Sequence, residues 1–119
     1  MKKILLIEDE KMIRDIYVTK LKQFGNFTIF EAITSDQAQN ILDKQVIDLI
    51  ILDVILPKED GLSYLKRLRE NNVNLPVIVL SNLEGEKYRK RAKELKTKEY
   101  ILKTSYTPTE VIEKIKKYL

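Results

Sequence analysis

The chain has 119 residues, of which 44% are hydrophobic and 34% charged, and its formal net charge is +4. This composition is typical of one folded globular domain and excludes a disordered chain. The sequence contains no cysteine and no histidine. Their absence excludes disulfides, zinc thiolate sites, thiol nucleophiles, Ser–His hydrolases and histidine phosphocarriers.

No stretch of the sequence predicts a targeting or membrane segment. The apolar run Ile4–Ile7 is too short for a signal peptide, because three acidic residues follow it directly. No run approaches the roughly 20 apolar residues that span a bilayer. We therefore expect a cytoplasmic protein that does not bind membranes.

The first half of the chain predicts two strands, each followed by a helix. Ile4–Ile7 precedes a helix that ends at Gly25, a C-cap glycine. The apolar face of that helix is predicted to hold Met12, Ile13, Ile16, Tyr17, Leu21 and Phe24. Phe27–Phe30 is the next strand, placed at a sheet edge because Thr28 makes it amphipathic. The second helix follows three capping candidates, Thr34, Ser35 and Asp36, and its apolar residues are Ala38, Ile41 and Leu42.

The second half predicts three further strands: Val46–Leu52, Pro76–Leu80 and the weaker Tyr100–Leu102. The first two lack polar alternation, as expected of parallel strands covered on both faces. Helical periodicity follows each strand, at Leu62, Leu65 and Leu68 with Asp60 as N-cap, at Tyr88, Ala92 and Leu95, and at Val111, Ile112, Ile115 and Leu119. Thr107 to Glu110 form a capping box with proline at the first helical position.

Five strands alternating with five helices predict a (βα)5 α/β fold, in which an open parallel sheet is covered by helices on both faces. We interpret residues 1–119 as one domain. Because the chain stops with the fifth helix, we expect no effector domain in it.

Polar side chains follow four of the predicted strands. They are Glu8 and Asp9 after the first strand, Asp53 after the third, Ser81 and Asn82 after the fourth, and Lys103 after the fifth. Sites in open α/β sheets form at the carboxyl ends of the strands, where the strand order reverses. Three carboxylates meeting there with one lysine favour a hard divalent cation, and Mg²⁺ fits best.

Each position also has a plainer interpretation. Any one acidic residue after a strand could be a solvated turn residue, and Asp9 could serve the dipole of the first helix. All four strand ends together favour a site. Asp48 lies at the opposite end of the third strand, so we interpret it as a strand-start residue.

The ordered set of Glu8-Asp9, Asp53, Ser81 and Lys103 resembles the receiver domain of two-component response regulators. Pro57 and Gly61 after Asp53 fit the family's loop, and Tyr100 falls at the position of its aromatic switch residue. The resemblance covers the chain from about Lys3 to Leu119. It implies a flavodoxin-like, doubly wound sheet of strand order 2-1-3-4-5.

The resemblance also implies a role for each of these residues. Asp53 would accept a phosphoryl group, and Lys103 and a cation would neutralise its charge. Ser81 and Tyr100 would then switch conformation. The ligands of Mg²⁺, with Mn²⁺ as an alternative, would be Asp9, Asp53, Glu8 through water and the backbone carbonyl of Ile55. The protein would assist its own phosphorylation and dephosphorylation without being a turnover enzyme. Apolar Ile55 and Leu83 would flank the path of a hydrolytic water and slow dephosphorylation.

The implied donor is a histidine kinase or a histidine phosphotransfer protein. The implied output surface comprises the fourth helix, fifth strand and fifth helix, through which a target protein or a second, phosphorylated copy would bind. The sequence departs from the family pattern at Ser81, which replaces threonine, at Asn82, which replaces a small residue, and at Thr104, which replaces proline.

Other classes of function fit parts of the sequence. An Mg²⁺-dependent aspartyl phosphohydrolase normally has a second acid two residues after its nucleophile, where this chain has Ile55. The segment from Glu84 to Lys98 carries seven basic and three acidic residues, and the rest of the chain carries fifteen of each. This segment is interpreted as a solvated helix face or a docking surface. A nucleic-acid-binding module is disfavoured by the modest total charge. A receiver-like docking module that is never phosphorylated remains an alternative.

Overall fold

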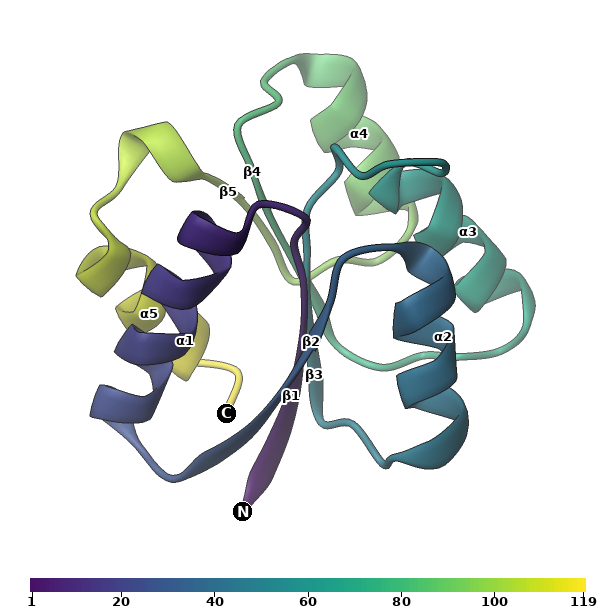
Figure 1. Ribbon diagram of the computed structural model, residues 1–119. Coiled ribbons are helices and arrows are strands. Elements are labelled where there is room, and N and C mark those ends of the chain that lie inside the picture. The colour runs from purple at the N-terminus through teal and green to yellow at the C-terminus, as the bar shows by residue number, and fades with distance from the viewer.

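The computed structural model describes residues 1–119, whose five strands form one parallel sheet of order β2-β1-β3-β4-β5 (Figure 1). The strands are β1 (Lys2–Ile7), β2 (Phe27–Ala32), β3 (Leu49–Leu52), β4 (Val77–Ser81) and β5 (Glu99–Leu102). The helices are α1 (Lys11–Phe24), α2 (Ser35–Lys44), α3 (Gly61–Glu70), α4 (Glu86–Glu94) and α5 (Pro108–Lys116), and a short 3-10 helix covers Lys103–Ser105. The predicted (βα)5 fold and strand order are confirmed, with β2 at an edge.

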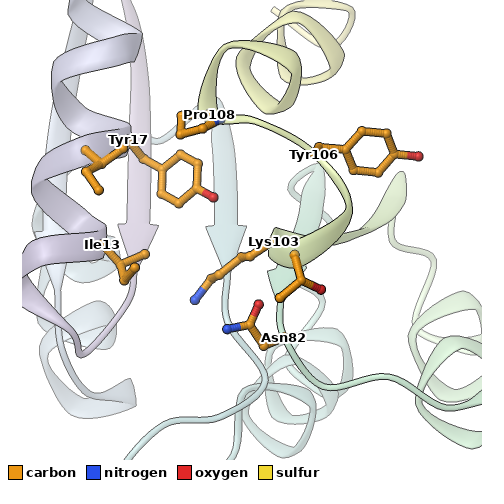
Figure 2. Close-up of a pocket in the computed structure, with 8 residues that line it drawn as sticks. Ile13, Tyr17, Asn82, Lys103, Tyr106 and Pro108 are labelled. Atoms are coloured by element: carbon orange, nitrogen blue, oxygen red, sulfur yellow. The ribbon is translucent and has the colours of Figure 1, made fainter.

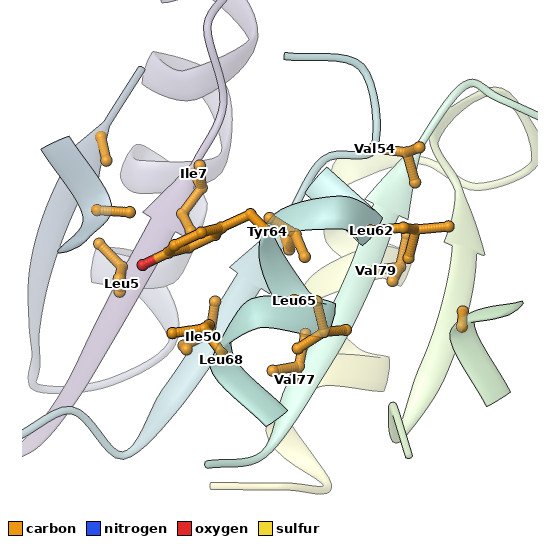
Figure 3. Packing of buried hydrophobic residues seen from close by; sticks show 14 of the residues in the cluster. Leu5, Ile7, Ile50, Val54, Leu62, Tyr64, Leu65, Leu68, Val77 and Val79 are labelled. Atoms are coloured by element: carbon orange, nitrogen blue, oxygen red, sulfur yellow. The ribbon is translucent and has the colours of Figure 1, made fainter. Parts of the chain in front are cut away.

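Helices cover both faces of the sheet, α1 and α5 on one and α2, α3 and α4 on the other (Figure 1). Successive residues of a strand point to opposite faces. Leu49 and Ile51 of β3 therefore pack toward α1 and α5, whereas Ile50 and Leu52 pack toward α2, α3 and α4. In the latter layer, Tyr64 of α3 lies fully buried across the aliphatic side chains (Figure 3). Strands with both faces buried are built almost entirely of apolar residues, which explains the continuous apolar runs.

Three helix starts predicted from the sequence are confirmed by their hydrogen bonds. The Thr34 hydroxyl accepts from the Gln37 amide, and the Asp60 carboxylate accepts from the Ser63 amide at 2.9 Å. Thr107 and Glu110 exchange hydrogen bonds between side chain and backbone, completing the capping box. These contacts pair amide groups that the helices leave without partners.

The predicted apolar face of α1 is partly wrong. Tyr17 and Leu21 are buried, but Met12 is 79% exposed and Ile16 is 42% exposed. The predicted residues spread over too wide a sector, and only one stripe of a helix can face the sheet. Gly25 is the C-cap of this helix, as predicted, and its φ of 173° is extended backbone.

The third strand is shorter than predicted. Val46 is 77% exposed in the connection after α2, although the adjacent Ile47 is buried. The ladder of β3 begins only at Leu49, opposite Ile4. The carboxylate of Asp48 accepts a hydrogen bond from the Lys3 amide at 2.7 Å. Asp48 thus starts the strand, as expected, at the edge of the sheet far from the other carboxylates.

The register of the central strands determines where the polar side chains meet. Ile7 pairs with Leu52, so Glu8 and Asp53 leave the sheet side by side between β1 and β3, where the strand order reverses. Ser81 pairs with Leu102, which places Lys103 one residue beyond it. No helix of the chain is long and apolar enough to cross a membrane.

Candidate functional site

Asp53 lies at the centre of the predicted cluster and is 5% exposed. Its Oδ1 accepts hydrogen bonds from the Ser81 hydroxyl at 2.6 Å and from the Ile55 amide at 3.1 Å. Its Oδ2 accepts from the Lys103 ammonium at 2.7 Å. Both oxygens of one carboxylate are therefore held by separate donors, which fixes its orientation at the end of β3.

Lys103 also donates a hydrogen bond to Oε1 of Glu8, so it bridges the ends of β1, β3 and β5. Its side chain is only 9% exposed. Burial acts to lower the pKa of Lys103, but its hydrogen bonds to Asp53 and Glu8 raise that pKa overall. All peptide bonds are trans, including the one to Thr104. Lys103 thus reaches both carboxylates without the proline that is usual after this lysine.

Glu8 and Asp9 occupy different environments at the end of β1. Glu8 is 2% exposed, and burial raises its pKa although the Lys103 hydrogen bond opposes the rise. Asp9 is exposed, and its side chain makes no hydrogen bond or ion pair. Arg14 of α1 holds this turn by donating to the backbone carbonyls of Glu8 and Asp9 at 3.0 and 3.3 Å. The sequence does not single out Arg14, because its backbone contacts and its ion pair with Glu31 arise only in the folded chain.

One carboxylate oxygen from each of Glu8, Asp9 and Asp53 lies within 4.8 Å of the others. Oxygen atoms of carboxylates are the ligands of hard cations such as Mg²⁺, Mn²⁺ and Ca²⁺. The cluster carries three carboxylates against the single ammonium of Lys103, so a divalent cation complements its charge. These residues fit a cation site, as the sequence predicted. The part predicted for the Ile55 carbonyl stays a prediction.

The backbone of Gly61, the first residue of α3, passes directly over Asp53. A Cβ atom at Gly61 would lie 2.0 Å from the Asp53 carbonyl oxygen, and the Gly61 amide donates to the Val54 carbonyl at 2.7 Å. Only glycine allows this approach. Gly61 therefore fixes the loop after β3, a constraint that the sequence analysis assigned only to a family pattern.

Tyr100 of β5 is half-buried, and burial raises the pKa of its phenol. Its hydroxyl donates a hydrogen bond to the carbonyl of Leu83, in the connection between β4 and α4. The amide of Leu83 donates in turn to the Ser81 hydroxyl at 3.3 Å. Tyr100 and Ser81 therefore both hydrogen-bond to Leu83, but they make no hydrogen bond with each other.

A pocket of about 270 Å³ opens beside Lys103, between α1 and the connection from β5 to α5 (Figure 2). Ile13 and Tyr17 of α1 form one side, and Asn82 and Lys103 form the other (Figure 2). Burial raises the pKa of Tyr17, which the sequence analysis placed only in the core. Asn82 is exposed and lines this pocket next to the acidic cluster.

The basic segment forms α4 and the turn that follows it, as predicted. Arg91 connects α4 to α3, with its guanidinium 3.1 Å from the Ser63 hydroxyl and 3.7 Å from the Asp60 carboxylate. Most other basic side chains of this segment are exposed. They lie apart from the acidic cluster, whose only cation is Lys103.

Fold and site together define a class: a doubly wound α/β domain with a lysine-bridged acidic cluster at the point where its strand order reverses. The family model of the response regulator receiver domain matches residues 4–116. The chain belongs to this family, the receiver domains of two-component systems.

Individual proteins are similar over nearly the whole chain. The regulatory protein VanR of Enterococcus faecium is 33% identical over 98% of this chain and 49% of its own length. The phosphate regulon transcriptional regulatory protein PhoB of Escherichia coli is 35% identical over 97% of this chain and 50% of its own. The chain thus spans about half the length of these curated relatives.

Solved receiver structures superpose closely. The Francisella response regulator 1452 receiver domain has a TM-score of 0.89 at 27% identity, covering 99% of this chain and 96% of its own. The Mn²⁺-bound form of response regulator Rcp1 has a TM-score of 0.86 at 26% identity, covering 98% and 92%. The predicted family and fold are confirmed.

Proposed function

We propose that Asp53 is the phosphoryl acceptor of this receiver domain. The observation that carries the proposal is the arrangement of donors on its carboxylate, with Ser81 on Oδ1 and Lys103 on Oδ2. Glu8 and Asp9 add carboxylate oxygens within 4.8 Å. A carboxylate oriented in this way can attack a phosphorus atom while neighbouring cations balance the charge.

The donor is a phosphohistidine of a histidine kinase or a histidine phosphotransfer protein. A carboxylate oxygen of Asp53 forms a bond to phosphorus while the phosphorus–nitrogen bond breaks. The electron pair of that bond stays on the ring nitrogen, and because the other ring nitrogen of the donor carries a proton, the histidine leaves as neutral imidazole. The product is an acyl phosphate on Asp53. The protein is itself the acceptor, so one phosphoryl group is taken up per chain and no substrate is turned over.

Asp9 and Asp53 would hold Mg²⁺, with Glu8 and the Ile55 carbonyl completing the protein ligands. When bound, the cation neutralises charge on the transferring phosphoryl group. Mn²⁺ is an alternative, and the Mn²⁺-bound form of the related Rcp1 supports it. Lys103 supplies a second positive charge and keeps Asp53 oriented.

Ser81 and Tyr100 form the proposed switch. An added phosphoryl group offers new acceptor oxygens, to which the Ser81 hydroxyl can turn from Asp53 Oδ1. Because Leu83 donates to Ser81 and accepts from Tyr100, a movement of Ser81 changes the contact that holds Tyr100. The signal would pass to a target protein or a second copy of the chain through α4, β5 and α5.

The docking site for the donor is the pocket between α1 and the β5–α5 connection. Ile16 of α1, an exposed apolar side chain, lines this pocket, and Lys103 reaches it from the acidic cluster. A donor helix placed there would bring its phosphohistidine next to Asp53. VanR and PhoB are named as regulatory proteins, and each is about twice the length of this chain. By analogy, the proposed output of this receiver is also regulatory.

The test is incubation with Mg²⁺ and a small phosphodonor, followed by intact-mass measurement. We expect one phosphoryl group on the wild type and none on Asp53→Asn. Asp48→Asn is the matched control, because Asp48 lies at the opposite end of the same strand, and it should be phosphorylated like the wild type. An adduct that persists in Asp53→Asn would refute the assignment. No adduct on the wild type would favour the receiver-like docking module that is never phosphorylated.

A further inference from the structure

Two hydroxyl groups hold the two ends of one residue, Leu83, between the acidic cluster and α4. The Leu83 amide donates to the Ser81 hydroxyl at 3.3 Å, and the Leu83 carbonyl accepts from the Tyr100 hydroxyl. Ser81 donates in turn to Asp53 at 2.6 Å. The position of the Tyr100 ring is therefore connected to Asp53 through a continuous set of hydrogen bonds.

Arg89 of α4 contacts Tyr100 at two points. Its guanidinium carbon lies 4.9 Å from the centroid of the Tyr100 ring, a distance at which a cation is attracted to the face of the ring. Its Nη1 lies 3.4 Å from the Tyr100 backbone carbonyl, to which it donates. Arg89 therefore covers the side chain of Tyr100 and also contacts the strand that carries it.

No carboxylate competes with these contacts, because Arg89 takes part in none of the ion pairs of the chain. Its neighbour Arg91 contacts the Ser63 hydroxyl and lies 3.7 Å from the Asp60 carboxylate, toward α3. The two arginines thus connect the same helix to different neighbours. Arg91 links α4 to α3, and Arg89 links α4 to Tyr100.

We propose that Arg89 is a positioning residue of the switch, which holds the Tyr100 ring in the orientation that places its hydroxyl on Leu83. The inference deepens the proposed function and rests on it for the roles of Asp53 and Tyr100. In this orientation Leu83 keeps its hydrogen bond with Ser81, and the Ser81 hydroxyl stays directed at Asp53. Any displacement of α4 that moves Arg89 would release the ring and loosen the acceptor site.

The contact predicts a measurable effect of modest size. A cation over an aromatic ring at an exposed site contributes enough to change a conformational equilibrium by about two- to fivefold. Arg89→Ala should lower the population of the observed Tyr100 orientation by this factor and slow phosphorylation by a small phosphodonor to a similar extent. Arg89→Lys keeps the charge but loses the planar group, so it should restore part of the loss.

The first measurement is the NMR signal of Tyr100 in the unphosphorylated protein, labelled with ¹³C in its tyrosine rings and assigned with Tyr100→Phe. The expected result is a shifted or broadened Tyr100 signal in Arg89→Ala. Lys87→Ala is the matched control, because Lys87 lies 5.0 Å from the ring of Tyr88 on the same helix. It should leave Tyr100 unchanged.

The second measurement is the phosphorylation rate in a Tyr100→Leu background. If Arg89 acts through the ring, Arg89→Ala should have no effect on the rate once the ring is absent. A Tyr100 signal unchanged by Arg89→Ala, or an equal loss of rate with and without the ring, would overturn the proposal. A shifted Tyr100 signal in a chain that accepts no phosphoryl group would instead overturn the proposed function while supporting the positioning role.

Discussion

The Lys103 ammonium lies 2.7 Å from Oδ2 of Asp53, although 50 residues separate them in the chain. It also contacts Glu8, so one cation serves two carboxylates that are nearly inaccessible to solvent. Lys103 therefore stabilises the folded chain even without a phosphoryl group, because it neutralises two buried carboxylates. Its removal should therefore be visible in stability as well as in activity.

We expect Lys103→Met to destabilise the protein at pH 7. The substitution leaves two buried carboxylates without their cation, and breaking such a pair costs about 3 kcal/mol or more. Urea unfolding at neutral pH measures the change in the free energy of unfolding. Lys114→Met is the control, since the ammonium of Lys114 lies 3.9 Å from Glu99 at a more exposed ion pair and should matter little. Equal stabilities of both variants would contradict the bridging role of Lys103.

The stability deficit of Lys103→Met should shrink in acid. Burial raises the pKa of Glu8 above its ordinary value of 4.5, and Lys103 opposes that rise. A pKa that is raised in the folded state means that protonated Glu8 favours folding. This contribution is complete below pH 4.5 and is lost as the pH rises through the folded-state pKa. Removing Lys103 should raise the Glu8 pKa further.

Unfolding of Lys103→Met and the wild type should therefore be compared from pH 7 down to pH 4. The deficit is expected to fall over this range. The double variant Lys103→Met/Glu8→Gln has no Glu8 carboxylate to protonate. Its stability deficit should therefore fall less between pH 7 and pH 4 than the deficit of Lys103→Met alone. A deficit that is independent of pH would show that the cost of Lys103→Met is lost packing alone.

The exposed carboxylate of Asp9 makes the proposed metal site testable without breaking a contact. Asp9→Asn removes repulsion within the acidic cluster and should raise the melting temperature without metal by about 3 °C. Mg²⁺ should stabilise the wild type more than this variant, because a ligand that binds only the folded state stabilises it by mass action. Glu113→Gln, at an exposed carboxylate of α5 outside the cluster, should leave the Mg²⁺ response unchanged. Equal Mg²⁺ responses of the wild type and Asp9→Asn would exclude Asp9 as a ligand.

Much of this site could be predicted from the sequence because its residues lie at the ends of strands or directly after them. In a parallel sheet all carboxyl ends lie at one edge, so the strand runs placed Glu8, Asp53, Ser81 and Lys103 together without any knowledge of side-chain positions. The fold followed from the same alternation of apolar runs and helical periodicity.

Other features depend on contacts that no local pattern reveals. Tyr17 belongs to a helix with apolar residues on several sides, and only the packed sheet selects the stripe that is buried. Val46 is as apolar as the strand that follows it, yet it lies in the connection after α2. Arg14 contacts backbone carbonyls as well as Glu31, and Arg89 contacts a carbonyl and an aromatic ring, so their charge alone does not identify their partners.

Gly61 illustrates the same point and leads to a further prediction. A Cβ atom there would lie 2.0 Å from the carbonyl oxygen of Asp53, so Gly61→Ala must displace either α3 or the loop after β3. We expect a loss of about 3 kcal/mol or more of stability, together with slower phosphorylation. Gly25→Ala is the matched control, because its Cβ would meet only the ring of Phe27 at 2.9 Å, which can rotate away. Similar small losses in both variants would show that the loop adjusts freely.

The last prediction concerns how long the acyl phosphate survives. Ile55 lies two residues after Asp53, its amide donates to Asp53 Oδ1 at 3.1 Å, and its side chain is 54% exposed. Leu83 is held through its backbone by Ser81 and Tyr100. Neither side chain can hydrogen-bond to a water molecule placed for attack on phosphorus. We therefore expect slow self-dephosphorylation.

Ile55→Asn should accelerate the loss of the phosphoryl group by about tenfold, because an amide at this position can hold the attacking water in line. Its side chain is exposed, so the substitution should cost little stability, whereas Leu83 is tied to the switch and is a less direct test. Val46→Asn changes an equally apolar, exposed residue away from the acceptor and should leave the decay unchanged. The measurement is the decay of the phosphorylated mass in Mg²⁺ buffer after the donor is removed. If the wild type decays within seconds and Ile55→Asn decays at the same rate, access of water to Asp53 is controlled by other groups, such as Asn82 and Lys103, which line the adjoining pocket.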